Sequence, residues 1–177
     1  MEKRMIFITG GCRSGKSRYA LHYADQHFSK KLFLATCGEV LDEEMAQRIE
    51  NHKKVRGPEW QTIEEPVDIV NKIKKDGGDS EVILIDCLTL WLYNLLMRWD
   101  NDLRIMEETE RLIDSLKKSH TSFLLVSNEV GMGIVPADPL SRRYRDLLGA
   151  MNQRIAEALD TVIFMVSGIP LFLKGKE

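Results

Sequence analysis

The sequence has few cysteines, no long apolar run and no excess of charge of one sign. Its 177 residues include three cysteines, far apart and without CxxC spacing: Cys12, Cys37 and Cys87. This pattern suits a reducing compartment and argues against a disulfide framework or a zinc site. No apolar run approaches the roughly 20 residues that span a bilayer. With 25 Lys and Arg against 27 Asp and Glu, the formal net charge is -2, so we expect no nucleic-acid partner and no membrane span.

Internal repeats, low-complexity tracts and linkers are missing as well. The turn cluster Gly77–Ser80 is too brief to separate two domains, so we expect a single domain over residues 1–177. The hydrophobic share of 44% and the charged share of 29% are typical of a soluble globular chain. The first residues lead into an apolar run without a cleavage-site pattern. We therefore expect no secretion signal and a cytoplasmic location.

Apolar runs of strand length alternate with segments of helix length. The predicted strands are Met5–Thr9, Leu32–Thr36, Val82–Asp86, Ser122–Ser127 and Thr161–Val166, with Gln61–Glu64 as a further short candidate. The predicted helices are Lys16–Phe28, Asp42–Lys54, Val67–Lys75, Leu88–Trp99, Asp102–Lys118 and Pro139–Leu159. This alternation predicts an α/β fold whose mostly parallel sheet is covered on both faces. Ser167-Gly168 predicts a C-terminal hairpin before Ile169–Leu173, and Pro170 restricts that last strand to a sheet edge.

One motif carries specific chemistry, because residues 10–17 fit G-x-x-x-x-G-K-[ST] at every fixed position, between a strand and a helix. Glycines let the backbone curl so that its N–H groups point at phosphate oxygens, and the helix N-terminus adds positive charge. Lys16 neutralises the β and γ phosphates. The motif predicts a three-layer P-loop NTPase-type fold and a nucleoside triphosphate as substrate. Its nucleotide-binding residues are Gly10, Gly11, Cys12, Arg13, Ser14, Gly15, Lys16 and Ser17.

Two residues are candidates to bind Mg²⁺, which takes few protein ligands and prefers oxygen. The Ser17 hydroxyl is one, and Asp86, at the carboxyl end of a four-residue apolar run, is the other. The alternative for Asp86 is that it merely caps the helix that follows.

The predicted helix Asp42–Arg56 gathers cations around a histidine. Arg48 and His52 are four residues apart and therefore share a face, and three more cations crowd the same end: Lys53, Lys54 and Arg56. One interpretation is that an anion docks there, with His52 as a nucleophile toward phosphorus that its cationic neighbours keep neutral. The alternative is a solvated basic end that complements the helix C-terminus, with His52 as a bystander.

Other segments have a functional and a structural interpretation. Asn128-Glu129 follow a strand and precede a turn with Gly131 and Gly133, a suitable place for a carboxylate that faces a substrate; alternatively they only end the strand. In the last helix, a stripe at helical spacing predicts core residues: Leu140, Tyr144, Leu147, Met151, Ile155 and Leu159. An apolar group in the preceding helix is expected in the core or at a subunit contact: Trp91, Leu92, Leu95 and Leu96.

An ordered series of motifs, from the first strand to the last, resembles one family. The markers are the loop TGGCRSGKS at 9–17, Ala35-Thr36, DEEM at 42–45, Arg48-Ile49-x-x-His52, Trp60-x-Thr62-x-Glu64, DCLTLWLYNLL at 86–96, VSNEVGMGIVP at 126–136, RDxxGxxNQ at 145–153 and Gly168-x-Pro170-Leu171. Together they resemble the bifunctional adenosylcobinamide kinase/adenosylcobinamide-phosphate guanylyltransferases of cobalamin biosynthesis.

The resemblance implies two reactions. ATP or GTP phosphorylates adenosylcobinamide, and GTP then transfers GMP to adenosylcobinamide phosphate, which gives adenosylcobinamide-GDP and pyrophosphate. The second reaction passes through a GMP–histidine intermediate in this family, and the matching residue is His52. Besides the loop, the implied nucleotide contacts are Ala35, Thr36, Cys37, His52, Lys53, Lys54, Val55, Arg56, Glu64 and Asp86. The resemblance also implies a homotrimer.

Two residues depart from the family pattern, and two rival functions remain. Cys12 stands where Ala is expected and Cys37 where Ser is expected, so Cys37 is the weaker hydrogen-bond donor to a nucleotide. One rival is a plain small-molecule kinase in which His52 takes no part. The other is a nucleotide-dependent switch that acts through a partner, although no Gln-bearing switch segment supports it.

Overall fold

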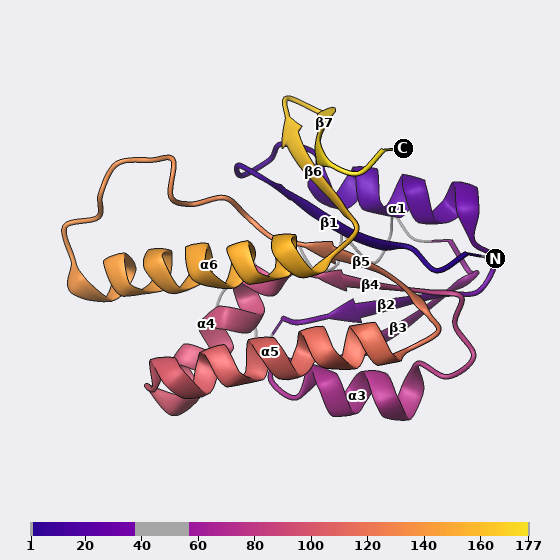
Figure 1. The fold of residues 1–177 in the computed structure, drawn as a ribbon, viewed down its shortest axis with the longest axis horizontal. Coiled ribbons are helices and arrows are strands. Elements are labelled where there is room, and N and C mark those ends of the chain that lie inside the picture. Colours follow the sequence, from indigo (N-terminus) through magenta and orange to yellow (C-terminus); the bar gives the residue numbers. More distant parts are fainter. Residues whose placement is uncertain (1, 38–56, 177) are drawn as a thin grey trace.

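The computed structural model describes residues 2–37 and 57–176, and within them a seven-stranded sheet has the order β3-β2-β4-β5-β1-β6-β7 (Figure 1). The strands are β1 (Met5–Gly10), β2 (Lys31–Ala35), β3 (Trp60–Glu64), β4 (Val82–Asp86), β5 (Ser122–Val126), β6 (Thr161–Val166) and β7 (Ile169–Lys174). The helices are α1 (Lys16–His27), α3 (Ile69–Asp76), α4 (Leu88–Trp99), α5 (Asp102–Lys118) and α6 (Pro139–Ala158). Every neighbouring pair is parallel except β6 and β7. The predicted mostly parallel sheet with a C-terminal edge hairpin is confirmed.

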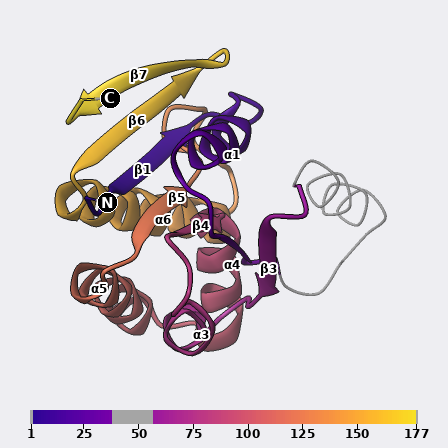
Figure 2. The same ribbon diagram turned by 90° about the vertical axis from the view of Figure 1, so that its right-hand side faces the viewer.

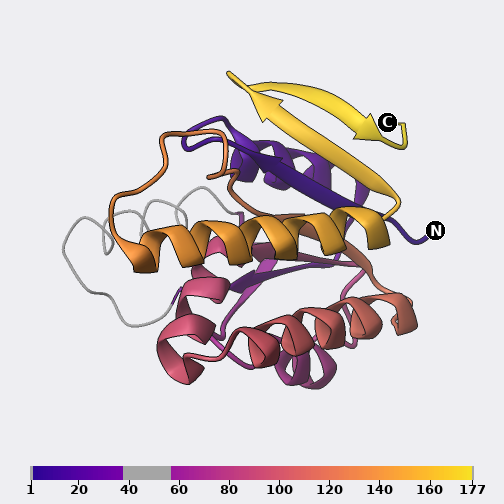
Figure 3. The same ribbon diagram turned by 60° about the vertical axis from the view of Figure 1, so that its left-hand side comes forward.

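Helices cover both faces of the sheet, which gives the predicted three layers (Figure 2). Alternate residues along each central strand enter two separate cores. On one face, Phe7 and Leu34 pack with α3, α4, α5 and α6, and α5 and α6 lie side by side there (Figures 1 and 3). On the other face, Ile8 and Phe33 pack with α1. Burial on both faces explains why these strands are nearly continuous apolar runs.

Local capping decides where the helices begin. Asp68 accepts a hydrogen bond from the Asn71 N–H, so α3 begins two residues after the predicted Val67. Asn101 caps α5 through the Arg104 N–H in the same way. Asp138 caps α6, and Pro139 occupies the first helical position, where no backbone donor is needed.

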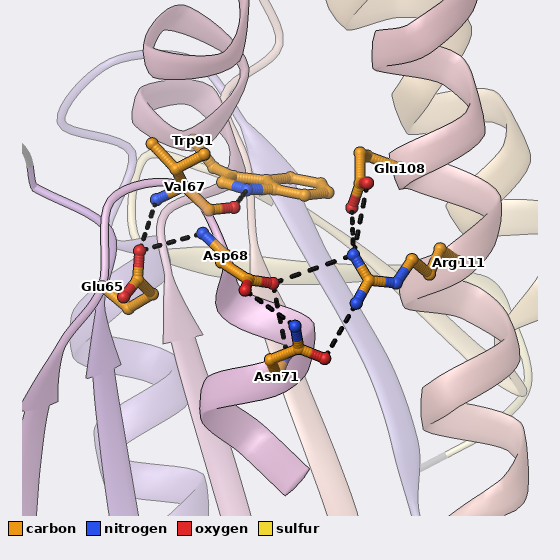
Figure 4. Close-up of polar contacts among 7 residues, drawn as sticks. All are labelled: Glu65, Val67, Asp68, Asn71, Trp91, Glu108 and Arg111. Atoms are coloured by element: carbon orange, nitrogen blue, oxygen red, sulfur yellow. Dashed lines mark hydrogen bonds and ion pairs between the residues drawn. The ribbon is translucent and has the colours of Figure 1, made fainter. Parts of the chain in front are cut away.

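A polar cluster holds α3, α4 and α5 together below the sheet (Figure 4). The Trp91 Nε1–H donates to the Val67 carbonyl at 2.8 Å, which attaches α4 to the segment before α3. From α5, Arg111 pairs with Asp68 at 3.8 Å and donates to the Asn71 side chain at 2.8 Å. The Arg111–Asp68 ion pair is exposed to water, so apolar packing contributes most of the stability on this face.

The core predictions hold with one exception. Leu147, Met151, Ile155 and Leu159 are buried, and Tyr144 is half-buried against the same core, but Leu140 is 49% exposed, because the first turn of α6 extends past the sheet (Figure 1). The apolar group in α4 (Trp91, Leu92, Leu95 and Leu96) is fully buried and belongs to the core rather than to a subunit contact. The short candidate strand is confirmed as β3, which pairs in parallel with β2. The predicted helix Asp42–Lys54 lies outside the described residues.

Candidate functional site

The carboxyl ends of five parallel strands meet at one edge of the sheet. Ala35 on β2 is level with Glu64 on β3 and with Asp86 on β4. Asp86 is in turn level with Val126 on β5, which is level with Ile8 on β1. Ligands of open α/β sheets bind at this edge. The structure therefore brings the phosphate loop, Asp86, the 35–37 segment and Glu64 to one side of the molecule.

Two glycines of the phosphate loop occupy conformations that other residues rarely adopt. Gly10 has φ +145°, and a Cβ there would lie 2.4 Å from the Met165 carbonyl oxygen. Gly15 has φ +97° and immediately precedes α1. The non-glycine Arg13 also has a positive φ of 55°. The loop therefore makes the tight curl that the motif predicts.

Lys16, the first residue of α1, is buried inside this curl. Its Nζ donates to the Gly11 carbonyl at 2.6 Å and to the Ser14 Oγ at 3.4 Å. Burial lowers the pKa of Lys16, and the nearby acidic groups of Cys87, Asp86 and Cys12 oppose this effect in part. A buried ammonium at the start of a helix is suited to an anion, because a bound anion replaces the hydration that burial removed.

Asp86 does not cap α4. The N-cap of α4 is Cys87, which makes no side-chain capping bond, and Asp86 is the last residue of β4. The register places Asp86 level with Val126 on β5, beside β1, and its charge raises the pKa of Lys16 against the effect of burial. Within residues 2–37 and 57–176, no group of three His, Cys, Asp or Glu side chains could hold a metal.

The Thr36 hydroxyl joins β2 to the segment after β4. It donates to the Cys87 carbonyl at 2.6 Å and accepts from the Cys87 N–H at 3.0 Å. The Asn94 amide donates to the Thr36 carbonyl at 2.9 Å. Burial and the adjacent Asp86 raise the pKa of the Cys87 thiol from 9.0 to about 11. Thr36 therefore fixes the backbone next to Asp86.

The other predicted nucleotide contacts divide into two groups. Ala35 is buried, Cys37 is half-buried, and Cys12 and Glu64 are exposed at the strand edge. The second group lies outside the described residues: His52, Lys53, Lys54, Val55 and Arg56. The role of His52 stays a prediction.

Two contacts of the phosphate loop were not predicted from the sequence. The Gly168 N–H donates to the Ser14 carbonyl at 2.9 Å, so the turn of the C-terminal hairpin is bonded to the loop. The Glu129 N–H donates to the Gly10 carbonyl at 2.9 Å, so the segment after β5 is bonded to it as well. The glycine of the Gly168-x-Pro170 motif was visible in the sequence, but its partner in the loop was not.

Comparison with known proteins places this site in a family. A family model described as cobinamide kinase / cobinamide phosphate guanyltransferase (CobU) matches residues 6–173. The chain belongs to this family. It is therefore a transferase, as the motifs predicted.

Curated members of the CobU family are similar over nearly their whole length. The bifunctional adenosylcobalamin biosynthesis protein CobP of Pseudomonas aeruginosa is 41% identical over 169 residues, which cover 96% of each chain. The bifunctional adenosylcobalamin biosynthesis protein CobU of Escherichia coli is 39% identical over 182 residues, which cover 96% of this chain and 99% of the relative. The CobU protein of Salmonella typhimurium is also 39% identical, with the same coverage.

Solved structures of more distant proteins share the fold. A KaiC-like protein of Pyrococcus horikoshii superposes with a TM-score of 0.58 at 16% identity, over 99% of this chain and 81% of that chain. The flagellar accessory protein FlaH of Methanocaldococcus jannaschii superposes with a TM-score of 0.55 at 14% identity, over 98% and 79%. These likenesses bear on the fold alone, and they agree with the P-loop NTPase-type fold predicted for this CobU family member.

Proposed function

We propose that the protein carries out two consecutive reactions at the carboxyl ends of the parallel strands. It phosphorylates the hydroxyl of adenosylcobinamide with ATP or GTP. It then transfers GMP from GTP to adenosylcobinamide phosphate through a GMP–His52 intermediate, releasing pyrophosphate and giving adenosylcobinamide-GDP. The observation that carries the proposal is the buried Lys16 amine inside the curl of the phosphate loop, in a chain of the CobU family.

The phosphate loop binds the triphosphate through main-chain N–H groups and Lys16. ATP and GTP carry the same triphosphate group, so these contacts serve either reaction. Contacts to the rest of the nucleotide come from Ala35, Thr36, Cys37 and Glu64, which lie at the same edge as the loop. The segment 52–56 completes the set on the basis of the resemblance.

The residues at the loop also fit a magnesium ion. Ser17 offers a hydroxyl and Asp86 a carboxylate, and two protein oxygens suffice because water and phosphate supply the other ligands of Mg²⁺. A lack of larger acidic or histidine clusters among the described residues agrees with such a sparse donor set. When bound, the ion would neutralise charge on the β and γ phosphates.

His52 supplies the nucleophile of the second reaction. A neutral imidazole nitrogen attacks the α-phosphorus of GTP, a nitrogen–phosphorus bond forms, and the bond to the bridging oxygen of pyrophosphate breaks. The phosphate of adenosylcobinamide phosphate then takes GMP from the histidine. Arg48, Lys53 and Arg56 would stabilise charge on the transferring oxygens.

We also propose a single domain over residues 1–177, a homotrimeric assembly and a cytoplasmic location. The resemblance supports the assembly. Among the described residues, no helix is long and apolar enough to cross a bilayer.

A covalent GMP adduct tests the second reaction directly. Incubate the protein with GTP and Mg²⁺, and measure intact mass for an added GMP that is labile in acid and stable in alkali. His52→Asn should abolish the adduct and spare the phosphorylation of cobinamide, whereas Lys16→Ala should weaken both reactions. The matched control is His120→Asn, because His120 is exposed and precedes β5, at the opposite edge of the sheet.

The outcomes separate the two reactions. An unchanged adduct in His52→Asn would overturn the assignment of the nucleophile. If the wild-type protein binds GTP and phosphorylates cobinamide but forms no adduct, the protein is a kinase only.

A further inference from the structure

The segment after β5 leaves the sheet between the two strands that hold the nucleotide site. Val126, the last residue of β5, is level with Asp86 on one side and with Ile8 on the other. The next residues, 127–129, therefore pass between the candidate metal ligand and the phosphate loop. Glu129, at the end of this segment, therefore lies at the same end of the sheet as the phosphate loop.

The backbone of this segment is fixed from three sides. The Asn128 N–H donates to the Thr89 Oγ1 at 2.8 Å, and the Asn128 carbonyl accepts from the Asn152 amide at 3.0 Å. The Glu129 N–H donates to the Gly10 carbonyl at 2.9 Å. Glu129 is therefore held at a set position relative to the first glycine of the loop.

The Glu129 carboxylate is oriented as well. Its Oε1 accepts the Gly131 N–H at 2.5 Å, and the side chain is half-buried. A carboxylate offers about four lone-pair sites on two oxygens, so one amide bond orients the group and leaves capacity for another donor. Glu129 thus combines a fixed position with an accessible acceptor.

The charge of Glu129 indicates what it binds. A carboxylate beside a triphosphate repels it, so Glu129 is unsuited to hold phosphate oxygens. The other two acidic residues of the site are placed differently. The charge of Asp86 acts on Lys16, and Glu64 lies on β3, two strands away from β4. A hydroxyl is a suitable partner for Glu129, because it donates a hydrogen bond to the carboxylate and can lose its proton to it.

Resting on the proposed function, we infer that Glu129 is the general base of the kinase reaction and binds the hydroxyl of the adenosylcobinamide arm. The hydroxyl O–H bond breaks and its proton passes to the Glu129 carboxylate. The oxygen forms a bond to the γ-phosphorus, and the bond from that phosphorus to the β–γ bridging oxygen breaks. The nucleoside diphosphate leaves with that oxygen, and the proton on Glu129 returns to solvent.

Apolar side chains beside Glu129 suit the large acceptor. Met132, Ile134 and Val135 follow within six residues and are 80%, 95% and 61% exposed. Exposed apolar side chains grouped next to a polar site are typical of a ligand-binding surface. The corrin ring would cover them while its arm reaches Glu129.

Only the kinase reaction needs a base to remove a proton from its acceptor, and this difference between the two reactions gives a test. In Glu129→Gln, the kcat for phosphorylation of adenosylcobinamide should fall about 100-fold or more. Guanylyl transfer to ready-made adenosylcobinamide phosphate should keep the wild-type rate, because that acceptor is already ionised near pH 7. Glu129→Asp should restore part of the kinase rate. The matched control is Glu157→Gln, an exposed glutamate on α6.

Each contrary outcome has a distinct meaning. If Glu129→Gln slows both reactions equally, the residue only shapes the phosphate loop through Gly10 and the inference is wrong. If the variant phosphorylates adenosylcobinamide at the wild-type rate, the inference is wrong as well. If the wild-type protein itself fails to phosphorylate adenosylcobinamide, the proposed function fails, and the role of Glu129 fails with it.

Discussion

The Gly168 N–H and the Ser14 carbonyl are joined by a hydrogen bond of 2.9 Å, although they lie at opposite ends of the chain. The contact is close at the backbone as well, since a Cβ at Gly15 would lie 3.3 Å from the Gly168 Cα. The turn of the β6–β7 hairpin is thus packed against the phosphate loop. Nucleotide binding should therefore depend on the C-terminal turn.

We expect Gly168→Ala to weaken nucleotide binding and to destabilise the fold. Gly168 has φ +84°, and a Cβ there would lie 3.2 Å from the Arg18 Nη2. A left-handed conformation costs a non-glycine residue about 1 to 2 kcal/mol. Calorimetric titration with GTP and denaturant unfolding measure the two effects.

The control for this substitution is Gly78→Ala. No atom lies within 4 Å of a Cβ built at Gly78, and the residue sits in the turn before β4, at the opposite edge of the sheet. If Gly168→Ala binds GTP as tightly as Gly78→Ala, the hairpin turn does not shape the loop.

The sequence predicted those features whose physical cause is local. The glycine spacing of the phosphate loop, the period of the strands and the edge position imposed by Pro170 are all properties of short segments. The contacts Gly168–Ser14 and Glu129–Gly10 depend on which strands become neighbours, which no local pattern encodes. Leu140 was misplaced for a related reason, because helical spacing predicts a face but not where the neighbouring sheet ends.

We expect Thr36→Val to destabilise the protein by about 1 to 3 kcal/mol, since it leaves the Cys87 N–H without the Thr36 hydroxyl and removes one of the two donors to the Cys87 carbonyl, which keeps the Trp91 N–H. The same change frees the backbone next to Asp86, so GTP affinity in the presence of Mg²⁺ should fall as well. Thr36→Ser keeps the hydroxyl and loses one methyl, at a cost of about 1 kcal/mol. Urea unfolding of both variants is the measurement; equal losses of stability would contradict a role for the hydroxyl.

Nucleotide binding should take up a proton at alkaline pH. Burial lowers the pKa of Lys16 in the free protein, and the charge of a bound triphosphate raises it again. Between these two pKa values the free protein has lost the proton and the complex holds it, so affinity falls as pH rises through that window. Titration calorimetry in buffers of different ionisation enthalpy measures the uptake. Lys16→Arg should abolish it, because arginine stays charged; uptake that persists in this variant would assign the proton to another group.

The cysteines of the site should differ in reactivity, because the thiolate is the form that reacts. Cys12 is exposed in the phosphate loop, whereas burial and Asp86 raise the pKa of Cys87 from 9.0 to about 11. The free energy of unfolding should therefore decline as pH rises above 9, because the unfolded chain releases the Cys87 proton before the folded one does.

We accordingly expect iodoacetamide at mildly alkaline pH to modify the exposed Cys12 in the native protein faster than the half-buried Cys87, whose thiol keeps its proton. Saturating GTP should slow the modification of Cys12, because the loop that carries this side chain closes around phosphate. Peptide mass mapping over a time course measures both rates, and Cys12→Ala is the control that removes the fast event. Modification of Cys87 as fast as that of Cys12 would mean that water reaches the Thr36–Cys87 bridge, and the rigid backbone assigned to the end of β4 would then be wrong.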